Sequence, residues 1–276
     1  PVVVNSAGPW CREVATRLDR DIADLHETSI AFNVLLEIPN LSSAALALEP
    51  AKPNPRTYFL VPVPGGALVG TFHAKWTGAL RDVRIPAEWL DEFMADLALA
   101  LPGLELGRSQ VRRVDWGFLP TDQEGSDKQS RRPIVVHHHD HGGIRGLFSV
   151  SGVKFTTARL IAEGTIDRAE DLLGRSPGQP CGQQRPPATR GLSLTQVRAA
   201  QAHNPDAVED EVRRLVSQEA VVHLDDLLVR RTDWGTEPGE AASVAREIAP
   251  LIDWPEEKIV EETARFENLG KASIWP

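Results

Sequence analysis

The stretch "GLFSVSGVKFTTARLIAEG", Gly146–Gly164, carries the strongest local signal for the fold of this chain. A short apolar strand runs into Gly152, then into Lys154 and two threonines, and at once into an amphipathic helix. A strand that stops at a glycine where a helix begins leaves backbone N–H groups of the helix N-terminus facing a cleft. Such groups hold anions and the electron-rich edges of ligands. The stretch therefore predicts a ligand site at the start of the helix.

The side chains of this stretch support two interpretations. Thr156 or Thr157 is suited to cap the helix, and Lys154 adds a full positive charge beside the partial charge of the helix N-terminus. An ordinary capped helix with a surface lysine explains the same pattern without any ligand. Spacing along the helix predicts one buried face, formed by Ala158, Ile161, Ala162, Thr165, Ala169 and Leu172.

Composition sets the class of protein. The chain has 276 residues, 41% hydrophobic and 25% charged, as is usual for a soluble globular protein of one large or two modest domains. A net charge of -9 argues against nucleic-acid binding, and no apolar run is long enough for a transmembrane helix. Cys11 and Cys181 form neither a disulfide framework nor a metal pair, so a cytoplasmic setting is expected. We interpret Pro1 as a truncation point within a longer protein.

Strand patterns dominate the first half of the chain. Residues 57–63 and 67–72 flank a glycine turn and predict a β-hairpin. Residues 86–103 predict a helix with a buried stripe at Trp89, Phe93, Leu97 and Leu101. Further strands are expected at 111–116, 133–139 and 147–151. The polar loop 120–132 separates the first two of these.

The second half reads as a linker followed by helices. Residues 174–191 are rich in Pro and Gly, and helical patterns follow at Val208–Val222, at 225–235, at 240–252 and at 253–266. We therefore place the domain boundaries at 1–173, 174–192 (linker) and 193–276 (helical). Asp225 and Asp226 are expected to pair with Arg230 and Arg231 on a helix surface. The tryptophans at 89, 116, 234, 254 and 275 are expected to pack in the core.

Two side-chain clusters suggest chemistry more weakly. In "VHHHDHGG", residues 136–143, a continuing strand would place His137, His139 and His141 on one face, but a solvated turn is the more common reading and no metal site is predicted. Arginines could pair with an anionic substrate, although each is more simply a surface residue: Arg112, Arg113, Arg131, Arg132 and Arg159. No GxGxxG fingerprint, P-loop or GxSxG elbow occurs.

Taken together, these motifs resemble one family. "VVVNSAGPW", residues 2–10, resembles the strand that closes the dinucleotide-binding half of FAD-dependent oxidoreductases of the D-amino-acid-oxidase superfamily, and residues 58–72 are similar to the hairpin over the flavin. Residues 147–164 resemble the segment of FAD-dependent glycerol-3-phosphate dehydrogenases in which a glycine, a lysine and paired threonines open a helix. Residues 211–235 look like that family's helical cap domain. The resemblance covers nearly the whole chain.

The resemblance implies a fold and a set of roles. The expected fold is α/β (α+β): part of an FAD-binding and substrate domain with mixed and antiparallel sheets, followed by a small all-α domain. Lys154 is expected to stabilise the reduced flavin or the substrate anion. Backbone groups of Gly152, Val153, Thr156 and Thr157 would line the flavin edge. Gly8 would lie near the ADP half of FAD.

Two departures from the family affect the substrate. The family's phosphate-binding arginine, in a Gly-Val-Arg-Pro stretch, is replaced by Leu119 in "WGFLP", residues 116–120. An active-site histidine of the family's substrate strand matches Asn33. Arg131 matches a second arginine near the substrate and is expected to orient it, with Arg132 beside it leaving the register uncertain by one. His139 and His141 are weak candidates for the base.

Three functions follow in order of preference. The first is an FAD-dependent dehydrogenase or oxidase, of which this chain is a fragment, acting on glycerol 3-phosphate or a related secondary alcohol. The second is a flavoenzyme acting on an amine or amino acid, and the third is a degenerate, non-enzymatic flavoprotein module. The expected partner is a small-molecule substrate. The electron acceptor, quinone or oxygen, stays open, as do peripheral membrane association and a homodimer.

Overall fold

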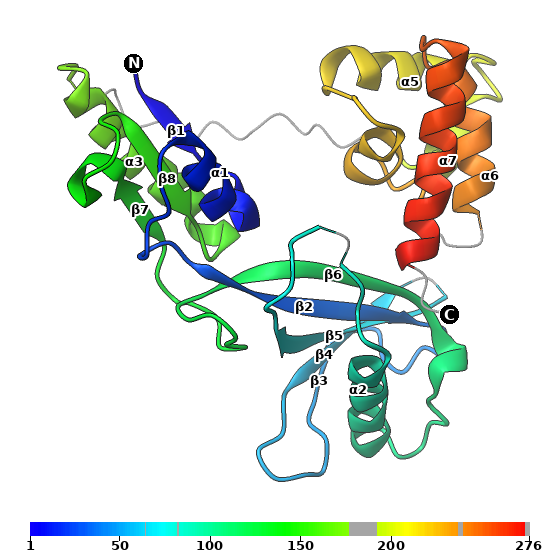
Figure 1. Ribbon diagram of the computed structural model, residues 1–276. Coiled ribbons are helices and arrows are strands. Elements are labelled where there is room, and N and C mark those ends of the chain that lie inside the picture. Colours follow the sequence, from blue (N-terminus) through cyan, green and yellow to red (C-terminus); the bar gives the residue numbers. More distant parts are fainter. Residues whose placement is uncertain (64, 82, 177–191, 237–239, 274–276) are drawn as a thin grey trace. The chain divides into compact units, whose positions relative to one another are not determined.

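The computed structural model describes residues 1–63, 65–81, 83–176, 192–236 and 240–273 (Figure 1). Most of the predicted linker, 177–191, lies outside these residues, as do Cys181 and Trp275. The chain divides into two compact units. The first comprises Pro1–Val34, Ile38–Arg108 and Asp115–Gln184, and the second comprises Leu35–Glu37, Ser109–Val114 and Arg185–Pro276.

A three-stranded mixed sheet in the first unit positions the candidate site. Its order is β1 (Val3–Asn5), β8 (Leu147–Ser151), β7 (Ile134–His137). Strand β1 (dark blue in Figure 1) runs parallel to β8, and β7 runs antiparallel to β8. Because β1 and β8 are parallel, their carboxyl ends meet at one edge of the sheet, where open α/β sheets bind ligands.

A helix follows each of these two parallel strands. After β1, a 3-10 turn (Gly8–Trp10) leads into α1 (Cys11–Leu18), which buries Cys11 and Ala15. After β8, a 3-10 turn (Phe155–Thr157) leads into α3 (Ala158–Leu172). The predicted strand, glycine and helix of residues 146–164 are therefore confirmed. On the predicted face of α3, Thr165 and Ala169 are buried, whereas Ala158 and Ala162 are exposed.

A second sheet has the order β3-β4-β5-β2-β6. The strands are β3 (Leu46–Leu48), β4 (Tyr58–Val63), β5 (Gly66–Lys75), β2 (Glu27–Leu36) and β6 (Val111–Thr121). Strands β4 and β5 pair antiparallel with Val63 opposite Gly66, which confirms the predicted hairpin. Strand β6 runs five residues beyond its predicted end at Trp116.

Aromatic side chains form the core beside this sheet. Phe32 of β2 stacks on Phe72 of β5 at 4.8 Å between ring centroids, and Phe93 meets Phe32 edge-on at 5.7 Å. Tyr58 of β4 also packs edge-on against Phe93, at 5.1 Å. Such arrangements stabilise a core beyond the area that they bury.

Helix α2 (Ala87–Ala100) supplies Phe93 and corrects the predicted stripe. Phe93 and Leu97 are buried as expected, but Trp89 and Leu101 are partly exposed. The buried face is Leu90, Phe93, Met94 and Leu97. A strict spacing of four drifts around a helix of 3.6 residues per turn, whereas this set stays on one side.

The histidine run is also corrected. The strand expected over 133–139 ends at His137, and His138–His141 form a 3-10 turn that Gly142 closes at φ 72°. The turn removes the shared face predicted for His137, His139 and His141. It buries His138 completely, with Nδ1 2.9 Å from Asp19 Oδ2 and Nε2 2.9 Å from Ser149 Oγ.

The described residues from 192 onward form helices, as predicted. They are α4 (Leu194–Ala200), α5 (Ala207–Gln218), a π-helical turn (Asp226–Arg231), α6 (Ala241–Ile248) and α7 (Glu256–Ser273). A capping box at Ser193 and Gln196 begins α4. The buried core of this unit includes Val212, Leu215, Leu227, Trp234 and Phe266.

Some predictions in this unit need correction. Helix α5 ends at Gln218, so Val222 lies beyond it and is exposed, because Ala220 at φ 51° turns the chain. Trp234 is buried as predicted, whereas Trp116 in the first unit is 40% exposed. Arg230 pairs with Asp226 at the predicted i,i+4 spacing, and Arg231 lies 3.7 Å from Glu219 instead.

Candidate functional site

The carboxyl ends of β1 and β8 bring together two segments that are far apart in the sequence. Asn5, the last residue of β1, lies opposite Ser149 of β8, and its side-chain Nδ2 donates to Ser149 Oγ at 3.0 Å. The same amide donates to the Cys11 carbonyl at 2.8 Å, which holds the start of α1 against the strand. The turn at Gly8 and the segment that begins at Gly152 therefore leave the sheet side by side.

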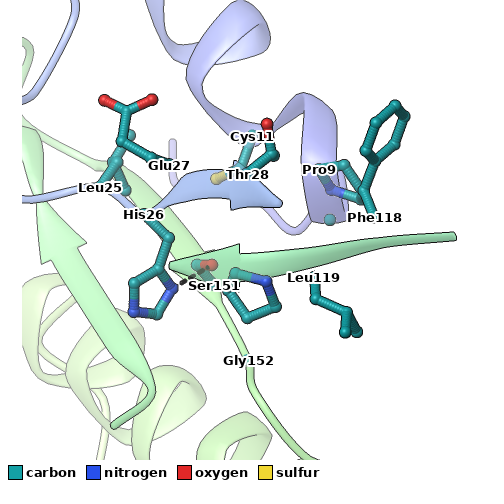
Figure 2. A pocket seen from close by; sticks show the side chains of 12 residues that line it. Pro9, Cys11, Leu25, His26, Glu27, Thr28, Phe118, Leu119, Ser151 and Gly152 are labelled. Carbon is teal, nitrogen blue, oxygen red and sulfur yellow. Dashed lines mark hydrogen bonds between the residues drawn. The ribbon is translucent and has the colours of Figure 1, made fainter. Parts of the chain in front are cut away.

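A small cavity, the inner pocket, lies between these segments. Figure 2 shows Pro9 and Cys11 from the N-terminal segment, Ser151 and Gly152 from the end of β8, and Leu119 beside them. The inner pocket encloses about 110 Å³. Its lining residues are Gly8, Pro9, Cys11, Leu25, His26, Glu27, Thr28, Phe118, Leu119, Pro120, Ser151 and Gly152. It therefore joins the β1 turn, the start of β2, the end of β6 and the end of β8.

An apolar groove, the α3 groove, opens on the other side of Gly8 and Gly152. It encloses about 320 Å³. Lys154 is its charged residue, and the others are mostly apolar: Val4, Ser6, Gly8, Val150, Gly152, Ala158, Ile161, Ala162, Thr165 and Ile166. Gly8 and Gly152 line both cavities, so they stand on the wall between the inner pocket and the α3 groove.

The two glycines leave room for a ligand to approach the backbone. Gly8 adopts φ 58°, and a Cβ built on it would meet no atom within 4 Å. A Cβ at Gly152 would contact only Ile161 Cδ1, at 3.8 Å. A side chain at Gly8 would be strained by its backbone conformation and would project into open space at the wall between the cavities. Glycine at these positions suits close contact with a bound group.

The start of α3 differs from prediction in its capping. Neither threonine side chain caps the helix; Thr157 Oγ1 instead donates to the Lys154 carbonyl at 3.2 Å. The reason is the 3-10 turn at Phe155–Thr157, which makes Thr157 the N-cap with a near-helical ψ of 3°. The first turn of α3 therefore has no side-chain acceptor of its own. Thr156 is exposed, Val153 is partly exposed, and Lys154 is exposed at the α3 groove.

The predicted substrate residues are only partly brought together. Leu119 lines the inner pocket. Asn33 lies on β2, where its Oδ1 accepts a hydrogen bond from Thr71 Oγ1 at 3.0 Å, and Arg131 is exposed. Neither Asn33 nor Arg131 lines the inner pocket or the α3 groove. Their roles therefore stay predictions.

The predicted base candidates lie outside the site. The His139 ring lies tilted beside that of His137 at 5.8 Å between ring centroids, and His141 Nδ1 lies 3.8 Å from Asp24 Oδ2. Neither lines the inner pocket or the α3 groove. Across the described ranges, no group of three or more potential ligand side chains is placed to hold a metal ion.

Sequence reasoning missed His26, which the structure places in the wall of the inner pocket. Its side chain is 3% exposed, and Nδ1 lies 2.7 Å from Ser151 Oγ (Figure 2). Burial lowers the pKa of His26, while the Asp122 carboxylate and the Arg132 carbonyl oppose that shift. The local sequence offers only a single histidine in front of an apolar stretch, which carries little information alone.

A larger cleft, the α1 cleft, shares His26 with the inner pocket and encloses about 670 Å³. Three of its residues hold buried side-chain nitrogens that lack a hydrogen-bond partner among the described residues: Arg12 Nε, His26 Nε2 and Trp76 Nε1. Buried polar atoms without partners are uncommon and concentrate at functional sites. The rest of the Arg12 guanidinium is paired, with Asp21 at 2.7 Å and Glu27 at 3.0 Å.

Comparison with known proteins confirms the resemblance found in the sequence. The chain is 30% identical over 190 residues to a glycerol-3-phosphate dehydrogenase of Synechocystis sp., covering 65% of this chain and 34% of that protein. It is 24% identical over 324 residues to a glycerol-3-phosphate dehydrogenase of Mycobacterium leprae, covering 99% of this chain and 54% of that protein. The chain thus spans about a third to a half of the length of these relatives. No protein-family model matches it.

A solved structure agrees with the fold. The glycerol-3-phosphate dehydrogenase of Bacillus halodurans, complexed with FAD, matches all of this chain with a TM-score of 0.67 at 20% identity, and the match covers 63% of that protein. At this identity the match supports the fold, which is the predicted α/β arrangement with a helical C-terminal part. Within the described ranges, no helix has both the length and the apolarity that crossing a bilayer requires.

Proposed function

We propose that this chain is part of an FAD-dependent oxidoreductase that oxidises glycerol 3-phosphate or a related secondary alcohol by hydride transfer to the flavin. The observation that carries the proposal is the meeting of Gly8, Gly152 and Lys154 at the carboxyl ends of β1 and β8. The similarity to glycerol-3-phosphate dehydrogenases supports it, as does the fold shared with a relative solved with FAD.

The described residues fit a flavin at this edge of the sheet. Gly8 and Gly152 leave open space where a planar ring and its chain could approach the backbone. The α3 groove is mostly apolar, as a ring system needs, and Lys154 supplies a positive charge at its side. Helix α3 has no side-chain cap, so the partial positive charge of its N-terminus is available to an acceptor.

A bound flavin would supply the hydride acceptor, and negative charge then develops at its pyrimidine edge. Lys154 and the N-terminus of α3 would stabilise that charge, because both carry positive charge at the edge of the α3 groove. Backbone groups of Gly152, Val153, Thr156 and Thr157 would line the same edge. Gly8 would face the ADP half of the cofactor.

The inner pocket constrains where a phosphate could bind. Among the described residues that line it there is no lysine or arginine. The sequence resemblance matches Leu119, which lines it, to the family's phosphate-binding arginine. Loss of a charge-assisted hydrogen bond costs about 1.5–3 kcal/mol. We therefore assign a phosphate to Lys154 or Arg131, outside the inner pocket, with the carbinol carbon inside it.

The same lining favours a second candidate, oxidation of an amine. Glu27 is an acidic residue of the inner pocket and pairs with Arg12 at 3.0 Å. Arg12 already engages that carboxylate, so what favours an amine is that the described lining residues include an apolar Leu119 and no cation for a phosphate. In this form the reaction type and the flavin stay the same, and the substrate class changes.

The test uses the protein expressed from its complete reading frame. Flavin absorbance is recorded anaerobically before and after addition of glycerol 3-phosphate, glycerol or a primary amine. Rapid bleaching with glycerol 3-phosphate would support the first form, and bleaching with the amine alone would support the second. A bound flavin that no substrate bleaches would keep the fold and reject both substrates. Purification without flavin would favour a non-enzymatic module.

A further inference from the structure

His26 is a buried titratable residue whose position joins the three segments around the inner pocket. It lies just before β2 and contacts Ser151 at the end of β8, and its ring faces Asp122 in the segment after β6. It lines both the inner pocket and the α1 cleft. A histidine that relays a proton from a pocket to solvent would have this placement.

The two ring nitrogens have different surroundings. Nδ1 lies 2.7 Å from Ser151 Oγ, a strong hydrogen bond. Nε2 has no hydrogen-bond partner among the described residues and lies 3.8 Å from Asp122 Oδ1. The Asp122 side chain is 72% exposed, so it connects the buried ring with solvent. Ser151, in turn, lines the inner pocket.

We propose that His26 accepts, through Ser151, the proton that the oxidised substrate releases, and that this proton leaves to solvent beside Asp122. The inference rests on the proposed function, because oxidation of an alcohol or an amine must release a proton as well as a hydride. It supplies the base that neither His139 nor His141 can provide from outside the pocket.

The proposed step balances. The carbinol carbon gives its hydrogen, with both bonding electrons, to the oxidised flavin of the proposed function, and the C=O bond forms. The substrate O–H bond breaks and its proton passes to Ser151 Oγ, while the Ser151 hydroxyl proton passes to Nδ1 of His26. The ring becomes an imidazolium, which the Asp122 carboxylate stabilises until one proton returns to water.

The charged groups around His26 are consistent with this role. Asp122 faces the ring from the segment after β6, and the Arg132 carbonyl faces it from the segment before β7. On the α1 side, Arg12 is already engaged by Asp21 and Glu27. Burial keeps the His26 pKa below its usual range, so the ring is neutral and ready to accept a proton at pH 7.

The first test needs no substrate. In the whole protein labelled with ¹⁵N-histidine, NMR assigns the tautomer of the neutral His26 ring, with His26→Gln identifying its signals. The proposal requires the proton on Nε2, because Nδ1 must accept from Ser151. A proton on Nδ1 would overturn it, since the ring would then donate to Ser151. Asp122→Asn should lower the His26 pKa further, because it removes a favourable negative charge.

The second test measures the pH profile of anaerobic flavin reduction by whichever substrate bleaches the flavin. His26→Gln keeps an acceptor for Ser151 but cannot take a proton, so the rate should fall about 10²–10⁴-fold and the acid limb of the profile should disappear. His73→Gln is the matched control: burial also lowers the pKa of His73, but it lines neither the inner pocket nor the α1 cleft. Its profile should match that of the unmodified protein.

The outcomes separate this inference from the proposed function. Flavin reduction by an alcohol or amine with an unchanged acid limb in His26→Gln would reject the proton route and keep the function. Loss of flavin binding in His26→Gln would assign His26 a structural role and reject the inference. If no substrate reduces the flavin, the proposed function fails, and the tautomer still decides whether His26 can accept from Ser151.

Discussion

Two buried polar clusters, one in each unit, differ in how completely their atoms are paired. In the helical unit, Glu262 is 4% exposed and accepts hydrogen bonds from Arg265, from His223 and from the Leu224 N–H. In the first unit, three buried nitrogens around the inner pocket and the α1 cleft, on Arg12, His26 and Trp76, have no hydrogen-bond partner among the residues that the structure describes. Among the described residues, the network around Glu262 is therefore paired, whereas the wall of the α1 cleft holds nitrogens that are not.

This difference indicates which buried polar groups stabilise the fold and which take part in binding or reaction. A fully hydrogen-bonded buried network fixes one arrangement of helices. Removing one partner destabilises the fold, because the remaining polar group stays buried without a hydrogen bond. A partly satisfied network is retained where a ligand or a proton completes it. We therefore expect substitutions in the helical unit to change stability and substitutions beside the inner pocket to change chemistry.

The largest stability effect is expected at Glu262. Glu262→Gln removes the negative charge that Arg265 and His223 surround, and should destabilise the helical unit by about 3 kcal/mol, at the low end for a buried pair because Arg265 is partly exposed. Hydrogen exchange of the α7 amides in the whole protein measures this. Glu257→Gln, on the exposed first turn of the same helix, is the control. Equal protection in both variants would contradict the prediction.

The same residue predicts acid sensitivity. Burial alone would raise the Glu262 pKa, but hydrogen bonds from Arg265, His223 and the Leu224 N–H outweigh it and lower the pKa to about 2. The unfolded-state pKa lies higher, so the stabilisation is complete above it and is lost as the pH falls toward 2. Exchange protection of α7 should therefore drop by more than in Glu262→Gln as the pH falls from about 5 toward 2, because the loss spans the interval between the unfolded-state and folded-state pKa values of Glu262.

An effect of similar size, on rate and not on stability, is expected at Lys154. Lys154→Met keeps the length of the side chain and removes its charge, so anaerobic flavin reduction should slow by about 10²–10³-fold with flavin still bound. Lys128→Met, on an exposed loop, is the control and should leave the rate unchanged. If both variants behave alike, Lys154 is an ordinary surface lysine, and residues 146–164 form a strand and a helix without a ligand site.

A gain of function is expected at Leu119, with a smaller effect. Leu119→Arg restores a cation at the inner pocket and should strengthen binding of glycerol 3-phosphate by about 1.5–3 kcal/mol relative to glycerol. The ratio of the two KM values measures this preference. Leu119→Met, which adds no charge, should leave the ratio as it is. A ratio that Leu119→Arg does not move would mean that the phosphate stays outside the inner pocket, at Lys154 or Arg131, even when a cation is offered at position 119.

The smallest effect is expected on the outer face of the helical unit. Arg213 pairs with Glu209 at 2.6 Å, and both side chains are largely exposed. Arg213→Ala should cost only about 0.3–0.5 kcal/mol, and less at high salt. Thermal unfolding at two salt concentrations tests this. A loss as large as that of Glu262→Gln would remove the contrast between buried and exposed charge.

Much of the fold could be predicted because its signals are local. The hairpin over Tyr58–Val63 and Gly66–Lys75 and the helix after Gly152 follow from turn residues and periodicity within about fifteen residues. The errors have local causes too. In helix α2, a spacing of four wrongly placed Trp89 and Leu101 on the buried face. The histidine run leaves the predicted strand and turns because Gly142 adopts a left-handed backbone conformation.

The candidate site could be predicted only in part. Gly8, Gly152 and Lys154 belong to short, contiguous sequence motifs, so they could be identified from the sequence alone. His26 could not be found in this way, because its proposed role depends on a contact with Ser151, which lies 125 residues further along the chain. Likewise, the burial of His138 depends on its contact with Asp19, 119 residues away. Residues that acquire a role through long-range contacts carry no signal in their own neighbourhood.

The hydrogen bond between Asn5 and Ser149 has a consequence for the order of folding. The two residues are 144 positions apart, and β1 and β8 are adjacent in the sheet. At a synthesis rate of about 5–20 residues per second, roughly 7 to 30 s separate the appearance of β1 from that of its partner on the ribosome. During that interval an apolar strand waits with an open edge. The wall that carries Gly8 and Gly152 is thus among the last parts of the first unit to assemble, because a large loop must close before it can form.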